Sequence, residues 1–177
     1  MDSHTHQSHR IKVRSETGTA RLAAQLSTLT TPGDILSLWG DLGTGKTSFA
    51  RAFINSLTDH AEEVPSPTFT LLQLYDTPRG EVYHFDMYRL EAPDDALELG
   101  IEDAFVDGIC LIEWPDRLGA WLPKNRLDII LQAGDCDNAR NVEIIARTPA
   151  WNERLAALPP WDTIEDIESD SPEPFAE

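Results

Sequence analysis

Short apolar runs alternate with helical stripes along the chain, a pattern typical of an α/β domain. Residues 35–39, with the sequence ILSLW, form an apolar run between turn residues, which predicts a strand buried on both faces. Similar runs bring the expected number to about seven strands, the others at residues 11–13, 69–75, 82–85, 109–112, 127–131 and 142–146. Apolar residues at helical spacing predict helices over residues 22–29 and 49–57, and an acidic first turn followed by Gly100 at the far end predicts a short helix over residues 93–99.

Both ends of the chain are poor in apolar residues. Residues 1–10 hold three histidines among serine, threonine and glutamine, which predicts a disordered tail. The far end, residues 159–177, is rich in acidic residues and contains no basic one, so a second solvated tail is expected there. Between the tails the pattern indicates one domain over residues 11–158.

Acidic residues dominate the charge, with 31 acidic against 14 basic residues and a formal net charge of −17. Such a surface repels phosphate backbones, so direct binding of DNA or RNA is not expected. No run of about 18 apolar residues occurs, so no membrane span is expected and a cytoplasmic location is predicted. Cys110 and Cys136 fit no CxxC pattern, and no chemistry is assigned to them.

Residues 40–47 read GDLGTGKT and match the pattern GxxxxGKT between a predicted strand and a predicted helix. Glycines let the backbone turn so that successive N–H groups point inward, and the start of the next helix adds partial positive charge. In this pattern Lys46 reaches the β- and γ-phosphates of ATP, and Thr47 places its hydroxyl on Mg²⁺. The expected nucleotide contacts are Gly40, Asp41, Leu42, Gly43, Thr44, Gly45, Lys46, Thr47 and Ser48.

The position of this glycine loop sharpens the expected fold. A strand, the loop and a helix in direct succession predict a P-loop NTPase-like α/β fold, a three-layer sandwich with a mixed, mainly parallel sheet. Residues 69–75 and 82–85 flank a turn that contains Pro78 and Gly80, which predicts an antiparallel hairpin in the same sheet.

Two acidic residues directly follow apolar strands. Asp86 ends the run VYHF and Glu113 ends the run ICLI, where the edge of a parallel sheet opens toward a ligand. A P-loop needs carboxylates there to orient Mg²⁺ and to polarise the attacking water. The sequence leaves open which of the two is the direct metal ligand, and an ordinary surface acid at a strand end is the alternative for either one.

A stiff polar loop, PSPTFT over residues 65–70, lies between the predicted P-loop helix and the next strand. In nucleotide switches such a loop supplies a hydroxyl that senses the γ-phosphate or its metal, and Thr68 is the candidate. A proline-stiffened connection without a further role is the alternative. Arg51 and Arg89 are additional candidates for phosphate contact, whereas His84 is expected to be a core or hairpin residue.

Several linked segments resemble one known family. The segments GDLGTGKTSFARAF, SPTFTLLQLY, VYHFDMYRLE, ELGIEDAF and ICLIEWPDRLG are similar in order and spacing to the bacterial TsaE family, formerly called YjeE, over residues 15–147. The resemblance implies an ATPase subunit needed for the threonylcarbamoyl modification of adenosine 37 in tRNA (t6A). It also implies TsaD-like and TsaB-like partners, contact with tRNA only through that complex, and ATP turnover that resets the complex and is slow without partners.

The resemblance further implies roles for the residues of the site. Lys46 serves the phosphates, Thr47 and Glu113 hold magnesium, and Asp86 acts in catalysis or supports the metal. The implied catalytic set is Asp86, Glu113, Lys46 and Thr68.

Other implied residues lie farther from the phosphates. Thr68 and Trp114 correspond to switch elements of the family, and Glu16 and Arg140 lie in segments that approach the nucleotide. Met87 stands where family members commonly have leucine, an apolar exchange that leaves the site intact.

Two other functions stay open beside an ATPase in a tRNA-modifying assembly. In a nucleotide-gated binding module, ATP occupancy would shape a surface for a partner and hydrolysis would be incidental. A small-molecule kinase is the third reading, against which stands the lack of an arginine-rich lid segment after the P-loop core.

Overall fold

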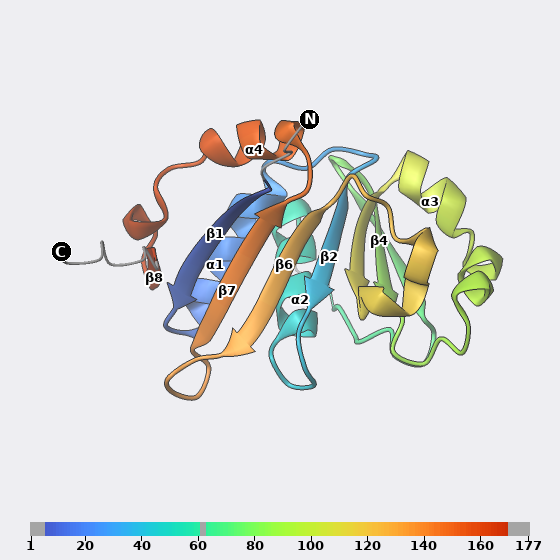
Figure 1. Cartoon of the computed structure of the whole chain (residues 1–177), viewed down its shortest axis with the longest axis horizontal. Coiled ribbons are helices and arrows are strands. Elements are labelled where there is room, and N and C mark those ends of the chain that lie inside the picture. Colours follow the sequence, from blue (N-terminus) through green and yellow to red (C-terminus); the bar gives the residue numbers. More distant parts are fainter. Residues whose placement is uncertain (1–5, 61–62, 170–177) are drawn as a thin grey trace.

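The computed structural model describes residues 6–60 and 63–169, and its strands form one sheet (Figure 1). The strands are β1 (Gln7–Val13), β2 (Ile35–Trp39), β3 (Leu72–Thr77), β4 (Gly80–Asp86), β5 (Ile109–Glu113), β6 (Leu127–Ala133), β7 (Arg140–Ala146) and β8 (Ile167–Ser169). The α-helices are α1 (Glu16–Ser27), α2 (Lys46–Leu57), α3 (Ile101–Asp107) and α4 (Pro149–Ala156). Short 3₁₀ helices are η1 (Pro93–Leu99), η2 (Pro115–Trp121) and η3 (Trp161–Thr163).

The sheet has the strand order β3-β4-β5-β2-β6-β7-β1-β8. Its centre is parallel, because β4 pairs with β5, β5 with β2 and β2 with β6 in the same direction. The strands on both sides are antiparallel, and β3 with β4 forms the expected hairpin. The predicted α/β fold with a mixed sheet is therefore confirmed, with eight strands in the described part of the chain against the seven expected.

Helices cover the sheet on two faces, which gives the expected three layers. Figure 1 shows α1 and α2 together behind β1, β7, β6 and β2. Along β5, Leu111 belongs to the apolar core under these helices, whereas Ile112 points the other way and packs in a second core with Phe85. That second core includes Ile101 of α3 and Leu118 of η2. Strand β5 is thus buried on both faces. The same holds for β2, as its apolar run predicts, with Leu36 in the first core and Ile35 in the second.

The helix after the glycine loop begins earlier than its apolar stripe. Its first residue is Lys46, preceded by Gly45 with a φ of 101°, while the buried apolar side chains start at Phe49. Phe49 and Phe53 are fully buried and stack against each other, with ring centroids 6.5 Å apart. This packing fixes the first turn of α2 against the sheet, and with it the loop that leads into the helix.

The predicted disordered tail over residues 1–10 is wrong for residues 7–10. These residues are part of β1 and pair with β7, from Gln7 opposite Ala146 onward. Backbone hydrogen bonds to a neighbouring strand do not require apolar side chains, so the polar composition concealed the strand. Residues 1–5 lie outside the described part of the chain.

The predicted solvated tail over residues 159–177 is wrong for its first half. Trp161 in η3 is 9% exposed and Ile167 in β8 is 3% exposed, and both pack into the core beneath α1 and α2. Strand β8 pairs with β1, opposite residues 11–13. The many acidic residues hid these two apolar anchors, and residues 170–177 lie outside the described part.

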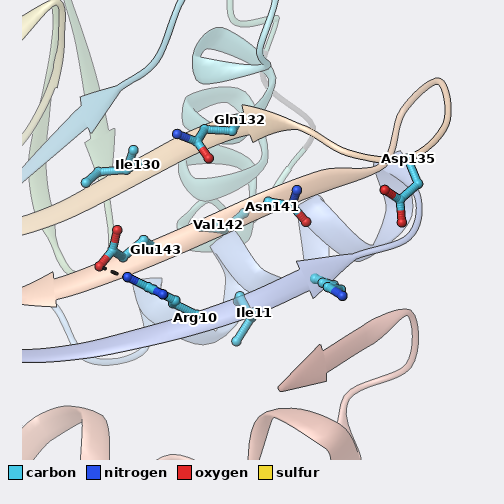
Figure 2. A pocket seen from close by; sticks show the side chains of 9 residues that line it. Arg10, Ile11, Ile130, Gln132, Asp135, Asn141, Val142 and Glu143 are labelled. Atoms are coloured by element: carbon cyan, nitrogen blue, oxygen red, sulfur yellow. Dashed lines mark ion pairs between the residues drawn. The ribbon is translucent and has the colours of Figure 1, made fainter. Parts of the chain in front are cut away.

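One face of the sheet carries a shallow polar hollow of about 520 Å³ over β6, β7 and β1. Figure 2 shows Gln132, Asn141, Glu143 and Arg10 beside it, with an ion pair between Arg10 Nε and Glu143 Oε1 at 3.8 Å. An exposed pair of this kind contributes little to stability. Within the described ranges, no helix has the length and apolar character that crossing a bilayer requires.

Candidate functional site

Three parallel strands end side by side and bring the predicted site residues together. Asp86 at the end of β4 lies opposite Glu113 at the end of β5, and Glu113 lies opposite Leu38 near the end of β2. Because β2 leads directly into Gly40, the glycine loop emerges beside both carboxylates. The carboxyl edge of a parallel sheet is where ligands bind in open α/β folds.

The glycine loop depends on backbone conformations that favour glycine. Gly40, Gly43 and Gly45 have φ values of 147°, 79° and 101°. A Cβ atom on Gly40 would lie 2.4 Å from Thr44 Oγ1 and 2.5 Å from the carbonyl oxygen of Leu131. The loop therefore passes so close to β6 and to its own last turn that only glycine fits at its first position.

Lys46 lies inward from the start of α2, 5% exposed. Its Nζ donates hydrogen bonds to the carbonyl oxygens of Gly40 at 2.6 Å and Asp41 at 2.8 Å, and lies 4.4 Å from the ring centre of Trp114. Burial lowers the pKa of Lys46, while the carboxylates of Glu113 and Asp86 raise it. The loop thus holds one ammonium group at its centre, close to the two carboxylates.

Glu113 is held at both of its oxygens. Thr47 Oγ1 donates to Glu113 Oε1 at 2.8 Å, and His84 Nε2 lies 2.7 Å from Glu113 Oε2. Glu113 is 2% exposed and His84 is fully buried. A buried carboxylate needs such partners, and here they come from α2 on one side and from β4 on the other.

Asp86 is also fixed at both oxygens. Thr68 Oγ1 donates to Asp86 Oδ2 at 2.8 Å, and the backbone N–H of Tyr88 donates to Oδ1 at 3.0 Å. Ser66 Oγ lies 2.7 Å from Thr68 Oγ1. The stiff loop over residues 65–70 is therefore connected to the strand-end carboxylate through the hydroxyl that the sequence singled out.

Trp114 follows Glu113 in a left-handed backbone conformation, with φ 56° and ψ 53°. This conformation is strained for a residue other than glycine, and such strain clusters at functional sites. Its ring contacts Tyr88, with ring centroids 4.9 Å apart, as well as the ammonium group of Lys46. The aromatic side chain thereby packs against the ammonium group that the glycine loop holds.

These residues line a groove of about 410 Å³ at the carboxyl edge of the sheet. The groove shares no lining residue with the hollow in Figure 2. Its lining includes most of the predicted set and two further residues, Ser66 and Tyr88: Leu42, Gly43, Gly45, Lys46, Thr47, Ser48, Ser66, Thr68, Asp86, Tyr88, Glu113, Trp114 and Arg140. Gly40 and Asp41 do not line the groove, but their carbonyl oxygens accept the hydrogen bonds of Lys46, which does.

A smaller hollow of about 100 Å³ adjoins the groove. Glu16 and Asn138 line it, and it shares Gly45, Ser48 and Arg140 with the groove. Arg140 Nε donates to the carbonyl oxygen of Thr44 at 2.6 Å, which ties β7 to the glycine loop. The structure therefore brings Glu16 and Arg140 to the loop, from two elements far apart in sequence.

The two additional arginine candidates are not among the residues that line the groove. Arg51 Nε donates to the carbonyl oxygen of Val64 at 3.1 Å, and the guanidinium of Arg89 lies 4.4 Å from the ring centre of Phe69. The strand predicted from residue 69 begins only at Leu72, so Phe69 lies in the preceding loop, where it is 80% exposed. Both arginines thus have other partners.

Sequence reasoning missed the part played by His84. A signal for it exists, because residues two apart on a strand point to the same face, and His84 is two residues before Asp86. Asn138, with a φ of 61°, was also missed, and its loop position offers no comparable signal.

Oxygen atoms suitable for a hard cation gather around Thr47. Its hydroxyl, Glu113 and Asp86 line one groove, whereas no group of three or more His, Cys, Asp or Glu residues that would hold a metal ion occurs in the described ranges. Mg²⁺ keeps several waters and is bound by one or two carboxylates together with phosphates, so a full protein cage is not required. The donor set fits magnesium bound with a phosphate ligand.

The site has the features that define a P-loop protein. A parallel strand leads into a glycine loop with three positive-φ glycines, and the next helix begins with lysine and threonine. Carboxylates stand at the ends of two adjacent strands. The family model described as "Threonylcarbamoyl adenosine biosynthesis protein TsaE" matches residues 13–142. The chain belongs to the TsaE family, as the motifs of the sequence predict.

Individual relatives agree with this assignment. The chain is 43% identical over 120 residues to TsaE of Haemophilus influenzae, covering 67% of this chain and 74% of the relative. It is 36% identical over 160 residues to TsaE of Rickettsia felis, covering 89% and 93%. The crystal structure of Bacillus subtilis YdiB superposes with a TM-score of 0.73 at 29% identity, covering 87% of this chain and 95% of YdiB.

Proposed function

We propose that this protein binds ATP with Mg²⁺ in the groove at the glycine loop and hydrolyses it slowly as a subunit of the machinery that makes t6A in tRNA. The relatives in Haemophilus influenzae and Rickettsia felis are each named as tRNA threonylcarbamoyladenosine biosynthesis protein TsaE, which supports the pathway. TsaD-like and TsaB-like proteins are the proposed partners, and ATP turnover is proposed to reset their complex. The cytoplasmic location stays a prediction.

One observation carries the nucleotide part of this proposal. The hydrogen bond of 2.8 Å between Thr47 and Glu113 lies beside the ammonium group of Lys46, at the start of a helix. A hydroxyl paired with a carboxylate suits magnesium, and an ammonium group at the N-terminus of a helix suits phosphate. Together they match the two parts of a magnesium–triphosphate ligand.

The chain's own residues can then serve hydrolysis. Lys46 and the N–H groups of the loop hold phosphate oxygens, and bound magnesium supplies charge neutralisation for the phosphates. Asp86 lies on the neighbouring strand with its orientation fixed by Thr68. A carboxylate in this position can accept a hydrogen bond from the attacking water and orient it toward the terminal phosphate.

The acidic surface agrees with an indirect role toward tRNA. A net charge of −17 opposes contact with a polyanion, so the proposed partners hold the tRNA while this subunit binds the nucleotide. Within the site, Lys46 and magnesium must overcome the same field to attract ATP.

Calorimetric titration with ATP, with and without Mg²⁺, tests the site. Lys46→Ala should abolish ATP binding, because it removes the ammonium group at the centre of the loop. Glu113→Gln should retain part of the binding and lose magnesium-dependent release of phosphate. Lys124→Ala, at an exposed lysine, is the matched control and should behave as the wild type. Unchanged binding in Lys46→Ala would remove the site assignment.

A nucleotide-gated binding module is the second candidate, and exposed apolar side chains at the site favour it. Leu42 in the glycine loop is 70% exposed, and Phe69 beside Thr68 is 80% exposed. Partner binding that follows ATP occupancy in a non-hydrolysing Asp86→Asn variant would support this module. If instead Asp86→Asn blocks repeated rounds of t6A formation while leaving partner binding intact, hydrolysis is essential.

A further inference from the structure

His84 is buried where the strand pattern places an ordinary core residue, yet it contacts the site. It is fully buried on β4, two residues before Asp86, and its Nε2 lies 2.7 Å from Glu113 Oε2. The opposite oxygen of Glu113 accepts the hydroxyl hydrogen of Thr47. His84 thus forms the inner end of a chain of hydrogen bonds that runs from the core through Glu113 to the start of α2.

The partners of the imidazole define its tautomer. An ionised carboxylate only accepts hydrogen bonds, so the proton of the imidazole lies on Nε2. His84 Nδ1 is buried and has no hydrogen-bond partner among the described residues. A proton on Nδ1 would have no acceptor there, so the contact with Glu113 is the one polar interaction that determines the ring's orientation.

An apolar residue would suit this place better if packing were the only requirement. Phe85 and Val82 on the same strand are fully buried without polar atoms, whereas His84 leaves a buried ring nitrogen unsatisfied. Leaving a buried polar atom without a partner costs free energy. The hydrogen bond to Glu113 offsets that cost, and it also gives Glu113 the second donor that a carboxylate 2% exposed needs.

We propose that His84 is a positioning residue that holds the Glu113 carboxylate so that one oxygen faces Thr47 and the magnesium bound with ATP. This inference rests on the proposed function, because it assigns the orientation of a metal-binding group. Without the bond from Nε2, the Glu113 side chain would be free to rotate about its terminal bond, and the oxygen at Thr47 would no longer be fixed. Residues that orient metal-binding groups in this way commonly change metal affinity on the order of 10- to 100-fold.

Calorimetry on matched variants tests the proposal. His84→Leu removes the donor, and His84→Gln retains an amide N–H near the place of Nε2. We expect magnesium to strengthen ATP binding in the wild type, and this magnesium-dependent gain to fall roughly tenfold or more in His84→Leu. His84→Gln should recover most of the gain. Affinity for ATP without magnesium should be the same in all three proteins, since Lys46 and the loop are intact.

The outcomes separate the inference from the function beneath it. A wild type that binds ATP no better with magnesium would overturn the proposed metal-dependent function and the inference with it. A wild type that responds to magnesium beside a His84→Leu variant that responds equally would overturn the positioning role alone. If the His84→Gln and His84→Leu variants lose the same fraction of the magnesium-dependent gain, His84 acts only through packing, and the proposal is also overturned.

A spectroscopic measurement keeps the proposal testable even where a variant fails to fold. Nitrogen-15 NMR of the imidazole in the folded wild type should show the proton on Nε2 of His84, protected from solvent exchange. Scalar coupling or a downfield proton shift should report its hydrogen bond, and Glu113→Gln should alter that signal. A proton found on Nδ1 instead would contradict the geometry on which the inference stands.

Discussion

Gly40 is the residue at which the glycine loop depends most on the absence of a side chain. A Cβ atom there would meet the backbone carbonyl oxygen of Leu131 at 2.5 Å, and φ is 147°. Gly43 provides a matched control, because it also has a positive φ but no atom lies within 4 Å of its added Cβ. We expect Gly40→Ala to lower the free energy of unfolding by about 3 kcal/mol and Gly43→Ala by about 1 kcal/mol, measured by urea denaturation.

The difference between the two variants is the informative quantity. In both variants an alanine must adopt a positive φ, which destabilises the folded state. Only Gly40→Ala also places a Cβ atom against β6. Equal losses of stability in the two proteins would show that the loop moves away from β6 without cost.

Thr68 offers a separate test of the loop over residues 65–70. Thr68→Val preserves the shape of the side chain and removes the hydrogen bond to Asp86 Oδ2. Under the proposed function we expect the turnover number to fall roughly tenfold, while the dissociation constant for ATP changes little, because Thr68 acts through Asp86. Single-turnover kinetics and calorimetry measure the two quantities. Thr70→Val, at an exposed threonine of the same loop, is the control. If Thr68→Val changed only the dissociation constant for ATP and left the turnover number unchanged, the role of Thr68 through Asp86 would be contradicted.

The site residues that the sequence revealed are those with a local signature. Lys46 and Thr47 follow from the spacing of the loop, and Asp86 and Glu113 from their places after apolar strands. His84 escaped because its function depends on which strand lies beside β4, and strand order is a property of the whole sheet. The spacing of two residues from Asp86 indicates a shared face, but no local feature of the apolar run reveals a carboxylate on the next strand.

Strand β1 and the short helix η3 meet through one aromatic contact that is sensitive to pH. Trp161 Nε1 lies 3.4 Å from His9 Nδ1, and burial lowers the pKa of His9. The folded state therefore disfavours the protonated ring, whereas the unfolded chain takes up a proton near the usual pKa of about 6.5. This contribution to stability is complete above pH 6.5 and is lost as the pH falls through the lowered pKa.

The variant His9→Phe should remove this part of the pH dependence. We expect the free energy of unfolding of the wild type to decrease between pH 7.5 and 5.5 more steeply than that of His9→Phe, measured by chemical denaturation at each pH. His60→Gln, at an exposed histidine, serves as the comparison. Parallel stability curves for wild type and His9→Phe would contradict the effect of burial.

Trp161 anchors the segment that the sequence had assigned to a tail. Its side chain is 9% exposed and packs in the same core as Ile167. Trp161→Ala should therefore lower the free energy of unfolding by about 3 kcal/mol, in the range for large core aromatics. Val106→Thr, at a residue 73% exposed, should change it by less than about 0.5 kcal/mol. A loss below 1 kcal/mol for Trp161→Ala would mean that η3 and β8 contribute little to the fold.

Elements with a regular apolar period were predictable, and elements held by single anchors were not. The buried strands β2 and β5 appear where their apolar runs lie. Strand β8 has three residues, of which one is buried, and the polar first half of β1 has no buried residue. Neither segment therefore shows an alternation of apolar and polar residues. Their place in the sheet is decided by long-range pairing, which a local sequence pattern does not indicate.

The two cysteines report on the cooperativity of the entire fold. Cys110 is fully buried on β5, and burial raises the pKa of its thiol to about 12, whereas Cys136 is exposed. Ellman's reagent should therefore label one thiol per chain in the native protein and two in denaturant. Labelling of Cys110 under native conditions should require global unfolding, because β5 lies at the centre of the sheet. Its rate should therefore equal the unfolding rate or be proportional to the equilibrium population of unfolded protein. Rapid labelling of both thiols in the native protein would contradict the buried position of β5.

Strand β1 has its two neighbours, β7 and β8, at the opposite end of the chain. During translation β1 leaves the ribosome before every other strand described. Its backbone N–H and C=O groups stay unpaired until β7 and β8 emerge. The sheet can therefore complete this edge only after nearly all of the domain has been synthesised. Until β7 emerges, residues 7–13 carry unpaired backbone N–H and C=O groups, the kind of segment that molecular chaperones shield from neighbouring chains.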